Sequence, residues 1–292
     1  MGKSVLDAIK AHVKDGRLQE GFTLSKAPFA DGAQDGIFMY HMGHEPASPE
    51  KVEAIRGVFK KALTGNFKKA DELYLKLGTG TLSIVDDIQD VVFEMGEGDR
   101  GAKIWDYAAY LIEEAEETEL VKFGLAIAEP FETDDDDVFK EELRTLALSD
   151  ELALFVIFNM RKWTNANEEI FELVKKVKGW GRVFGINFLN EGLSDEIKTW
   201  LITDGWDNAV MTEYSVLDIW NQAGAEERLK ADDITVGELT GIGRLIEASI
   251  GDGKPMSTLS SLENFDEIKS TWLAKAKTSG DSGLTEIIKV VD

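Results

Sequence analysis

The feature that most constrains this chain is a helix-pair unit that returns about every 30 residues from residue 84 onward. Each amphipathic segment is followed by a more apolar one. The pair Phe123-Gly124 has counterparts at Phe155-Val156 and Phe184-Gly185. One helix pair cannot bury its apolar face alone, so neighbouring pairs would stack and share a core. The recurrence predicts a mainly all-α fold of stacked helix pairs.

Apolar residues within these segments follow helical spacing, which predicts their buried faces. The predicted stripes are Ile104, Tyr107, Ala108, Leu111 and Ile112; Val138, Phe139, Leu143, Leu146 and Leu148; Ile170, Phe171 and Val174; and Ile197, Trp200 and Leu201. Two helix starts are also marked. Ser48 precedes Pro49, and Ser194 precedes two acidic residues, as expected of capping residues.

Two Gly-Trp pairs, at residues 179–180 and 205–206, enclose a short apolar helix and an acid-capped helix. A glycine at such a junction can adopt the left-handed conformation that ends a helix. The tryptophan would then pack across the junction. The stretch GIGR at residues 241–244 resembles GWGR at 179–182, which extends the same pattern.

On these motifs, roughly residues 84–250 resemble HEAT-like helical-repeat proteins. The stretches GWGRVFGINFL and SDEIKTWLITDGWDNAVMTEY also look like segments of uncharacterised bacterial members. The chain lacks the well-placed prolines and Asp/Arg pairs that such repeats usually carry. The resemblance implies a HEAT/armadillo-like α-solenoid with a concave binding surface, and it does not imply one activity.

The N-terminal region reads differently from the repeats. Residues 1–83 are predicted to form a cap, with extended runs at 21–25 and 37–42 arranged as a hairpin or irregular segment, followed by two helices. Residues 84–292 are predicted to hold the repeats and C-terminal capping helices. The stretch NFDEIKSTWLAKAKT supplies a closing helix. A divergent cap would cover the exposed end of a solenoid.

The charge of the chain is strongly negative and unevenly placed. The formal net charge is −23, and residues 86–142 carry 20 Asp and Glu against 4 Lys and Arg. Such a field repels phosphate backbones and favours basic partners. We therefore expect a protein or peptide partner rather than nucleic acid. The sequence leaves the oligomeric state open.

Composition also bears on the cellular location of the protein and on the reactions it could catalyse. The chain has no cysteine, which excludes disulfides and thiolate nucleophiles. No apolar run reaches the length of a membrane span, and the first residues lack a signal-peptide core. The interpretation is a cytoplasmic protein without a membrane partner or a cofactor.

Candidate chemical sites are sparse. His41, His44 and Glu45 could hold zinc if the turn at Gly43 brings them together. The acidic run at residues 133–137 is a weak calcium candidate, but it is better suited to begin the helix at Val138. The GTGT stretch at 78–81 is expected to be a loop. No Gly-x-Ser-x-Gly motif is present.

The leading functional hypothesis is a non-enzymatic scaffold that binds a protein or peptide along a concave helical face. Its candidate binding residues are Trp180, Asn187, Asn190, Trp206, Glu213, His41 and His44. Two alternatives stay open. One is a groove-based enzyme, such as a helical-repeat DNA glycosylase or a lyase. The other is a metal-dependent activity at His41 and His44.

Overall fold

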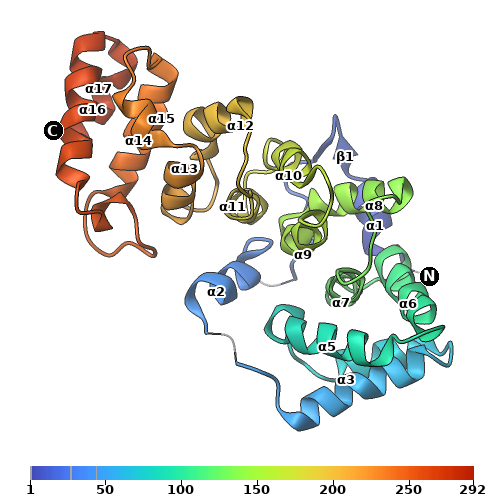
Figure 1. The fold of residues 1–292 in the computed structure, drawn as a ribbon. Helices are drawn as coiled ribbons and strands as arrows, with labels where there is room; N and C mark the ends of the chain where they lie inside the picture. The colour runs from blue at the N-terminus through green and yellow to red at the C-terminus, as the bar shows by residue number, and fades with distance from the viewer. Residues whose placement is uncertain (1, 27, 44) are drawn as a thin grey trace. The chain divides into compact units, whose positions relative to one another are not determined.

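The structure is a computed structural model that describes residues 2–26, 28–43 and 45–292. The described chain is all-α apart from one two-stranded sheet (Figure 1). It divides into two compact units, Met1–Ala166 and Asn167–Asp292, so the boundary predicted at residue 83 falls inside the first unit. Within the described residues, no helix has both the length and the apolar character needed to cross a bilayer.

The N-terminal unit begins with a short helix and a hairpin and continues as a series of helices. Its elements are α1 (Val5–Lys10), β1 (Val13–Lys14), β2 (Arg17–Leu18), α2 (Ala33–His41), α3 (Pro49–Ala62), α4 (Phe67–Leu75), the 3₁₀ turn η1 (Thr81–Ile84), α5 (Val85–Met95), α6 (Arg100–Glu114), α7 (Thr118–Ala128), α8 (Asp137–Ala147) and α9 (Asp150–Met160). Helices α3 and α4, α6 and α7, and α8 and α9 pack as sequential pairs, and α7 also packs on α5 and α9.

The C-terminal unit has most of its helices packed around helix α15. Its elements are α10 (Ala166–Val174, whose first residue belongs to the other unit), α11 (Trp180–Asn187), α12 (Asp195–Trp200), the π-helical turn η2 (Leu201–Gly205), η3 (Thr212–Tyr214), α13 (Val216–Gln222), α14 (Ala225–Lys230), α15 (Val236–Ser249), η4 (Leu259–Ser261), α16 (Phe265–Ser279), η5 (Ser282–Leu284) and α17 (Thr285–Val291). Helix α15 contacts η2, α13, α14, α16 and α17.

Both predicted helix starts are confirmed. The Ser48 side chain accepts a hydrogen bond from the backbone N–H of Lys51 at 3.4 Å, with Pro49 in the first helical position. Ser194 accepts one from the backbone N–H of Ile197 at 3.3 Å. Each hydroxyl satisfies a donor that the first turn leaves unpaired, which is why serine favours these positions.

The core of the N-terminal unit is built around Phe123 of α7. Its ring stacks on Tyr74 of α4, with centroids 3.7 Å apart, and meets Phe59 of α3 and Tyr107 of α6 at 5.9 and 6.2 Å. All four rings are buried. One aromatic side chain therefore joins three helices of the unit to α7, a geometry that adds to the free energy gained from area burial alone.

The two Phe-Gly pairs perform the same packing in different helices. A Cβ at Gly124 would lie 2.8 Å from Cβ of Leu111, and one at Gly185 would lie 2.2 Å from Cγ1 of Val174. Each glycine thus lets its helix approach the preceding helix of the chain, α6 for α7 and α10 for α11. The sequence correspondence between the pairs reflects a shared packing role.

The predicted stripes are largely buried, with a few exceptions. Ile104 to Ile112 on α6 and Ile170, Phe171 and Val174 on α10 are buried as predicted. Val138 is instead 73% exposed, because it lies off the stripe that Phe139, Leu143 and Leu146 bury on α8. Leu148, after the end of α8, and Trp200 are half-buried.

The hairpin prediction for residues 21–42 is wrong. The strands lie earlier, with Val13 opposite Leu18 and Lys14 opposite Arg17. Asp15 and Gly16 form the turn with φ of 50° and 72°, which is the conformation a two-residue hairpin turn requires. Residues 37–41, predicted as extended, belong to helix α2.

The Gly-Trp pairs do lie at junctions, but neither glycine is left-handed. Gly179 has φ of −88° and precedes α11, and Gly205 ends η2 without a positive φ. The two junctions are joined instead by Arg182. Its Nε donates to the carbonyls of Val174 and Val177, and its Nη1 donates to the carbonyl of Asp207 at 2.5 Å. The Arg182 guanidinium therefore satisfies main-chain carbonyls next to both Gly-Trp pairs.

Candidate partner-binding surfaces

The two tryptophans predicted to line a groove have different surroundings. Trp180 is 6% exposed and lies in the core of the C-terminal unit, stacked on Phe184 and edge-on to Tyr214, with centroids 5.6 and 5.0 Å apart. Trp206 is half-buried; its Nε1 donates to the Thr203 carbonyl at 2.9 Å. Of the two, Trp206 keeps more of its ring accessible.

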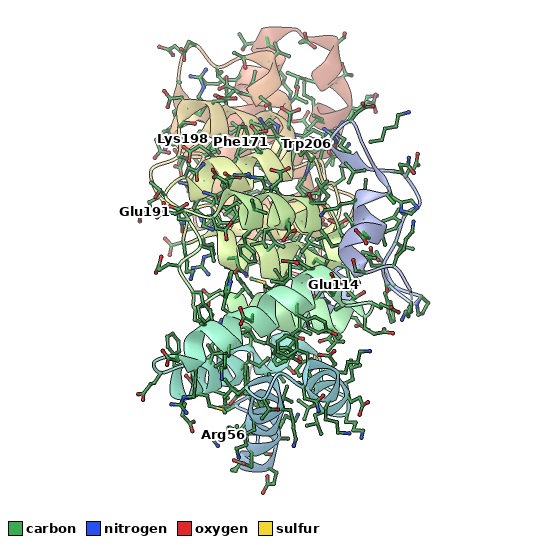
Figure 2. All side chains as sticks on the ribbon, turned by 90° about the vertical axis from the view of Figure 1, so that its right-hand side faces the viewer. Arg56, Glu114, Phe171, Glu191, Lys198 and Trp206 are labelled. Atoms are coloured by element: carbon green, nitrogen blue, oxygen red, sulfur yellow. The ribbon has the colours of Figure 1, made fainter. Side chains whose placement is uncertain are left out.

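Of the predicted polar residues, Asn190 lies at a cavity. Asn187 donates to Asp218 at 3.1 Å, where burial raises the pKa of the Asp218 carboxyl, and Glu213 pairs with Lys254 at 3.2 Å. Asn190 is exposed on a shallow cavity of about 360 Å³. The cavity is lined by Leu189, Asn190, Glu191, Gly192, Leu193, Lys198, Asn221 and Gln222, and Figure 2 labels Glu191 and Lys198.

The predicted histidine site is only partly described. His41 is exposed in the last turn of α2, and Glu45 is exposed in the segment that follows. His44 lies outside the described residues. Across the part of the chain that the structure describes, no three His, Asp or Glu side chains are grouped to hold a metal ion.

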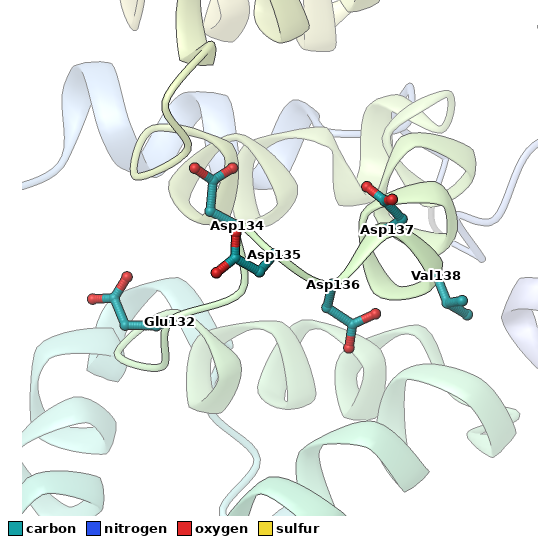
Figure 3. A pocket seen from close by; sticks show the side chains of 6 residues that line it. All are labelled: Glu132, Asp134, Asp135, Asp136, Asp137 and Val138. Carbon is teal, nitrogen blue, oxygen red and sulfur yellow. The ribbon is translucent and has the colours of Figure 1, made fainter.

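The acidic run begins helix α8 as predicted and borders an open cavity of about 480 Å³ (Figure 3). Two of its carboxylates have structural roles. Asp136 accepts from the backbone N–H of Phe139 at 3.0 Å and caps the helix. Hydrogen bonds from Lys140 and Thr164 lower the pKa of Asp134 to about 2. The cavity is lined by Glu132, Asp134, Asp135, Asp136, Asp137 and Val138.

An apolar hollow adjoins this acidic loop. Phe93 of α5 is 67% exposed, at the edge of a cavity of about 280 Å³ lined by Val92, Phe93, Gly96, Glu97, Pro130 and Phe131. The ring of Phe131 packs against the ring of Trp105, with centroids 5.4 Å apart. Phe131 lines this hollow and the next residue, Glu132, lines the acidic cavity, so the two cavities meet along the chain at residues 131–132.

We call Phe93, Glu97, Pro130, Phe131, Glu132, Asp135, Asp137 and Val138 the acidic–aromatic surface. Its carboxylates at residues 97, 132, 135 and 137 form no ion pair with a described Lys or Arg side chain. Phe93 and Val138 are the most exposed large apolar side chains of the described chain. Exposed apolar groups with unpaired charge of one sign beside them are typical of a protein-interaction site.

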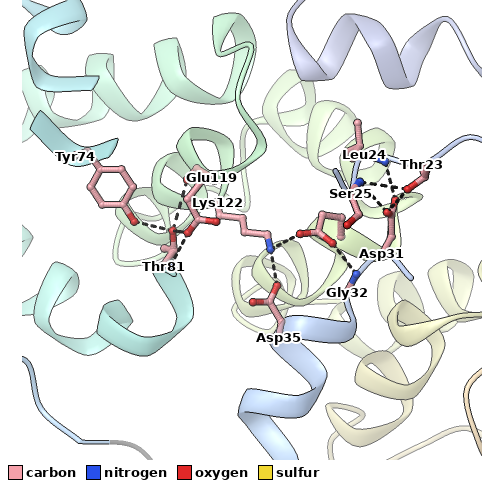
Figure 4. Close-up of polar contacts among 11 residues, drawn as sticks. Thr23, Leu24, Ser25, Asp31, Gly32, Asp35, Tyr74, Thr81, Glu119 and Lys122 are labelled. Atoms are coloured by element: carbon pink, nitrogen blue, oxygen red, sulfur yellow. Dashed lines mark hydrogen bonds and ion pairs between the residues drawn. The ribbon is translucent and has the colours of Figure 1, made fainter. Parts of the chain in front are cut away.

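A third feature is the buried Lys122 of α7 (Figure 4). Its side chain is 3% exposed, and its Nζ lies 2.7 Å from carboxylate oxygens of both Asp35 and Glu151. Glu151 also accepts the backbone N–H of Gly32 at 2.7 Å. The cluster joins α2 to α7 and α9, elements that are distant in the sequence.

The electrostatics of the cluster favour a charged lysine. Burial disfavours the ammonium, but the attraction of Asp35 and Glu151 outweighs it and raises the pKa of Lys122. Burial raises the pKa of Asp35 to about 6, despite the opposing effect of Lys122. A lysine held protonated cannot act as a nucleophile, and the three side chains form a buried ion-pair cluster that ties α2 to α7 and α9.

No family model matches the chain, and comparison with curated proteins and with solved structures gives no match either.

Proposed function

We propose that this protein is a non-enzymatic scaffold of the HEAT-like helical-repeat class that binds a basic segment of a partner protein at the acidic–aromatic surface. The observation that carries the proposal is the exposed Phe93 at the rim of an apolar hollow next to unpaired carboxylates. The matching roles of Gly124 and Gly185 support a repeated helix-pair design, and a cytoplasmic location is part of the same proposal.

The apolar part of the surface would supply most of the affinity. Covering a Phe side chain removes apolar area worth about 2 kcal/mol, or about thirtyfold in the dissociation constant. A partner side chain that fills the hollow between Phe93 and Phe131 would add to this. Buried aromatic anchors are the usual energetic centre of such interfaces.

The carboxylates would select the partner and guide its approach. Exposed charges at the rim of an interface add little affinity each, but they repel acidic segments and speed the encounter with basic ones. Their effect is screened by salt. We therefore expect a Lys- or Arg-rich segment with one large apolar residue, bound more weakly at high ionic strength.

The experiment uses three synthetic peptides in fluorescence anisotropy. One carries lysines around a central Leu-Phe pair, the second replaces its lysines with glutamates, and the third replaces Leu-Phe with Ser-Ser. The first should bind, and its affinity should fall between about 50 mM and about 500 mM salt because the charges are screened. Equal binding of the acidic peptide would contradict the proposal.

The matched variants are Phe93→Ser and Leu75→Ser. Both side chains are exposed in the N-terminal unit, so neither change should unfold it. Phe93→Ser should weaken binding about thirtyfold and Leu75→Ser should leave it unchanged. A Phe93→Ser protein that binds the basic peptide as tightly as the wild type would place the site elsewhere.

The alternatives draw no comparable support. A helical-repeat DNA glycosylase needs a basic surface for the duplex, whereas this unit presents clustered carboxylates. The metal-dependent alternative depends on His44, which the structure does not describe.

A further inference from the structure

Residues 22–26 and 28–43, which we call the strap, are attached to the N-terminal unit in an unusual way. The strap contains α2, whose buried residues are Asp35 and Gly36. Among its large apolar residues, Phe29, Ile37 and Met42 are exposed, and Phe38 and Met39 are half-buried. A surface helix ordinarily turns its apolar stripe inward. In the strap, the most deeply buried side chain is instead the carboxylate of Asp35.

Ion pairs and a backbone hydrogen bond attach the strap to the rest of the unit. Asp35 pairs with Lys122 of α7, and the backbone N–H of Gly32 donates to Glu151 of α9. A third contact, from Lys26 to Glu117 at 2.8 Å, is solvent-exposed. In addition, Phe22 stacks on His12, with ring centroids 4.4 Å apart, and α2 packs on α9 and η1. A segment whose helix buries no complete apolar stripe can leave its site at lower cost than one that does.

The strap is ordered by contacts of its own. Asp31 accepts the Thr23 hydroxyl at 2.5 Å and the backbone N–H groups of Leu24 and Ser25 at 2.9 Å (Figure 4). These bonds join residues within the strap and do not tie it to α7 or α9. They would persist in a strap that had moved away.

The buried cluster that holds the strap carries unequal charge. One ammonium, that of Lys122, faces two carboxylates, Asp35 from the strap and Glu151 from α9. Glu119 of α7 adds a further acidic group, and η1 presents Thr81, whose N–H and hydroxyl donate to Glu119. An excess negative charge in a poorly solvated site is unfavourable, and one proton would neutralise the triad.

We propose that the strap is a displaceable latch over α7 and α9, and that proton uptake by the Asp35–Lys122–Glu151 cluster tightens it. In the neutral range the latch opens more readily. Opening uncovers Lys122, Glu151 and the face of α7 and α9 beneath α2. At acidic pH the cluster takes up a proton, its net charge becomes zero, and the latch closes.

The pKa of Asp35 gives the sign and the range. It is raised by burial to about 6, and in a released strap it would return toward its ordinary value of 3.8. The docked strap therefore binds the proton more tightly. Acidification through this interval favours docking, and raising the pH above about 6 removes the added stabilisation.

The test is hydrogen–deuterium exchange of the intact chain, with amide rates corrected for their intrinsic pH dependence. Protection of residues 33–41 should rise about tenfold from about pH 7.5 to about pH 5, because the docked state gains a proton over this range. Amides of α6 serve as the internal reference, since α6 belongs to the same unit whereas α2 packs on α9 and η1. Unchanged or reduced protection at the lower pH would overturn the proposal.

The variant Asp35→Asn removes the excess charge at every pH. Its strap should show the acid level of protection at neutral pH and lose the pH dependence. The control Glu117→Gln breaks the exposed pair with Lys26 and should keep the wild-type pH dependence. An Asp35→Asn strap that exchanges faster than the wild type at neutral pH would show that the carboxylate holds the strap, contrary to the proposal. If this variant fails to fold, the wild-type pH series decides.

Discussion

Replacing Arg182 with methionine should destabilise the C-terminal unit more than any neighbouring surface change. Arg182 is 4% exposed, and its guanidinium donates to three main-chain carbonyls within 3.0 Å, those of Val174, Val177 and Asp207. It also lies 5.2 Å above the Trp200 ring. Methionine keeps the aliphatic volume but leaves these carbonyls without their donor.

The magnitude follows from two opposing contributions. Each hydrogen bond from a charged donor contributes about 1.5 kcal/mol or more, so three give about 5 kcal/mol. Methionine also avoids the cost of burying a charge, which stabilises the variant by about 2 kcal/mol and offsets part of that loss. The expected loss is about 3 kcal/mol in the free energy of unfolding, or about 10 °C in the Tm of a unit of this size.

Thermal and urea unfolding, followed by tryptophan fluorescence and circular dichroism, would measure this loss. The matched control is Arg244→Met, because Arg244 ends the related GIGR stretch and lies 5.7 Å above Trp206, yet its side chain is 38% exposed and pairs locally with Glu247. The control should cost less than about 1 kcal/mol. An Arg182→Met protein as stable as the control would refute the capping argument.

Two further predictions concern helix α15. Gly241→Ala would place a Cβ 1.7 Å from the Ile202 carbonyl oxygen and should lower the free energy of unfolding by more than about 3 kcal/mol. In Gly237→Ala the nearest neighbour of the new Cβ is 3.7 Å away, so this variant should gain about 0.5 kcal/mol in the free energy of unfolding. Urea unfolding measures both, and equal effects would contradict this packing. Hydrogen bonds from Arg228 lower the pKa of Glu238 to about 2, so stability present above pH 4.5 should be lost as the pH falls through about 2. The loss should reach about 2 kcal/mol and be absent in Glu238→Gln, and an acid transition unchanged in that variant would exclude Glu238 as its source.

Local signals in the sequence predicted much of the fold. Ser48 and Ser194 cap helices because a short hydroxyl side chain can reach the first-turn donors in any tertiary setting. The hairpin turn at Asp15-Gly16 carried an equally local signal, since an Asp-Gly pair favours the two positive φ values found there. The prediction of extended runs at 21–25 and 37–42 relied instead on the Gly- and Asp-rich segment between them, which does not specify a two-residue turn.

The binding features depend on contacts that no local pattern contains. Lys122 stands within an apolar helix and meets Asp35 and Glu151, which are 87 and 29 residues away in the chain. Phe93 belongs to an apolar run with Val91 and Val92, and the sequence does not show which of these the fold leaves outside. Tertiary packing decides both cases, so periodicity identifies the helices and not the surface they form.

The carboxylates of the acidic–aromatic surface are exposed to solvent, whereas the cluster that holds the strap is buried away from solvent. Salt screens exposed charges over about 8 Å but affects buried pairs much less. Salt should therefore weaken peptide binding and leave strap protection unchanged. Acidification should tighten the strap through Asp35, a group with no place on the acidic–aromatic surface. If salt and pH moved both measurements together, the two features would be one coupled site, and the strap would have to be treated as part of the binding surface.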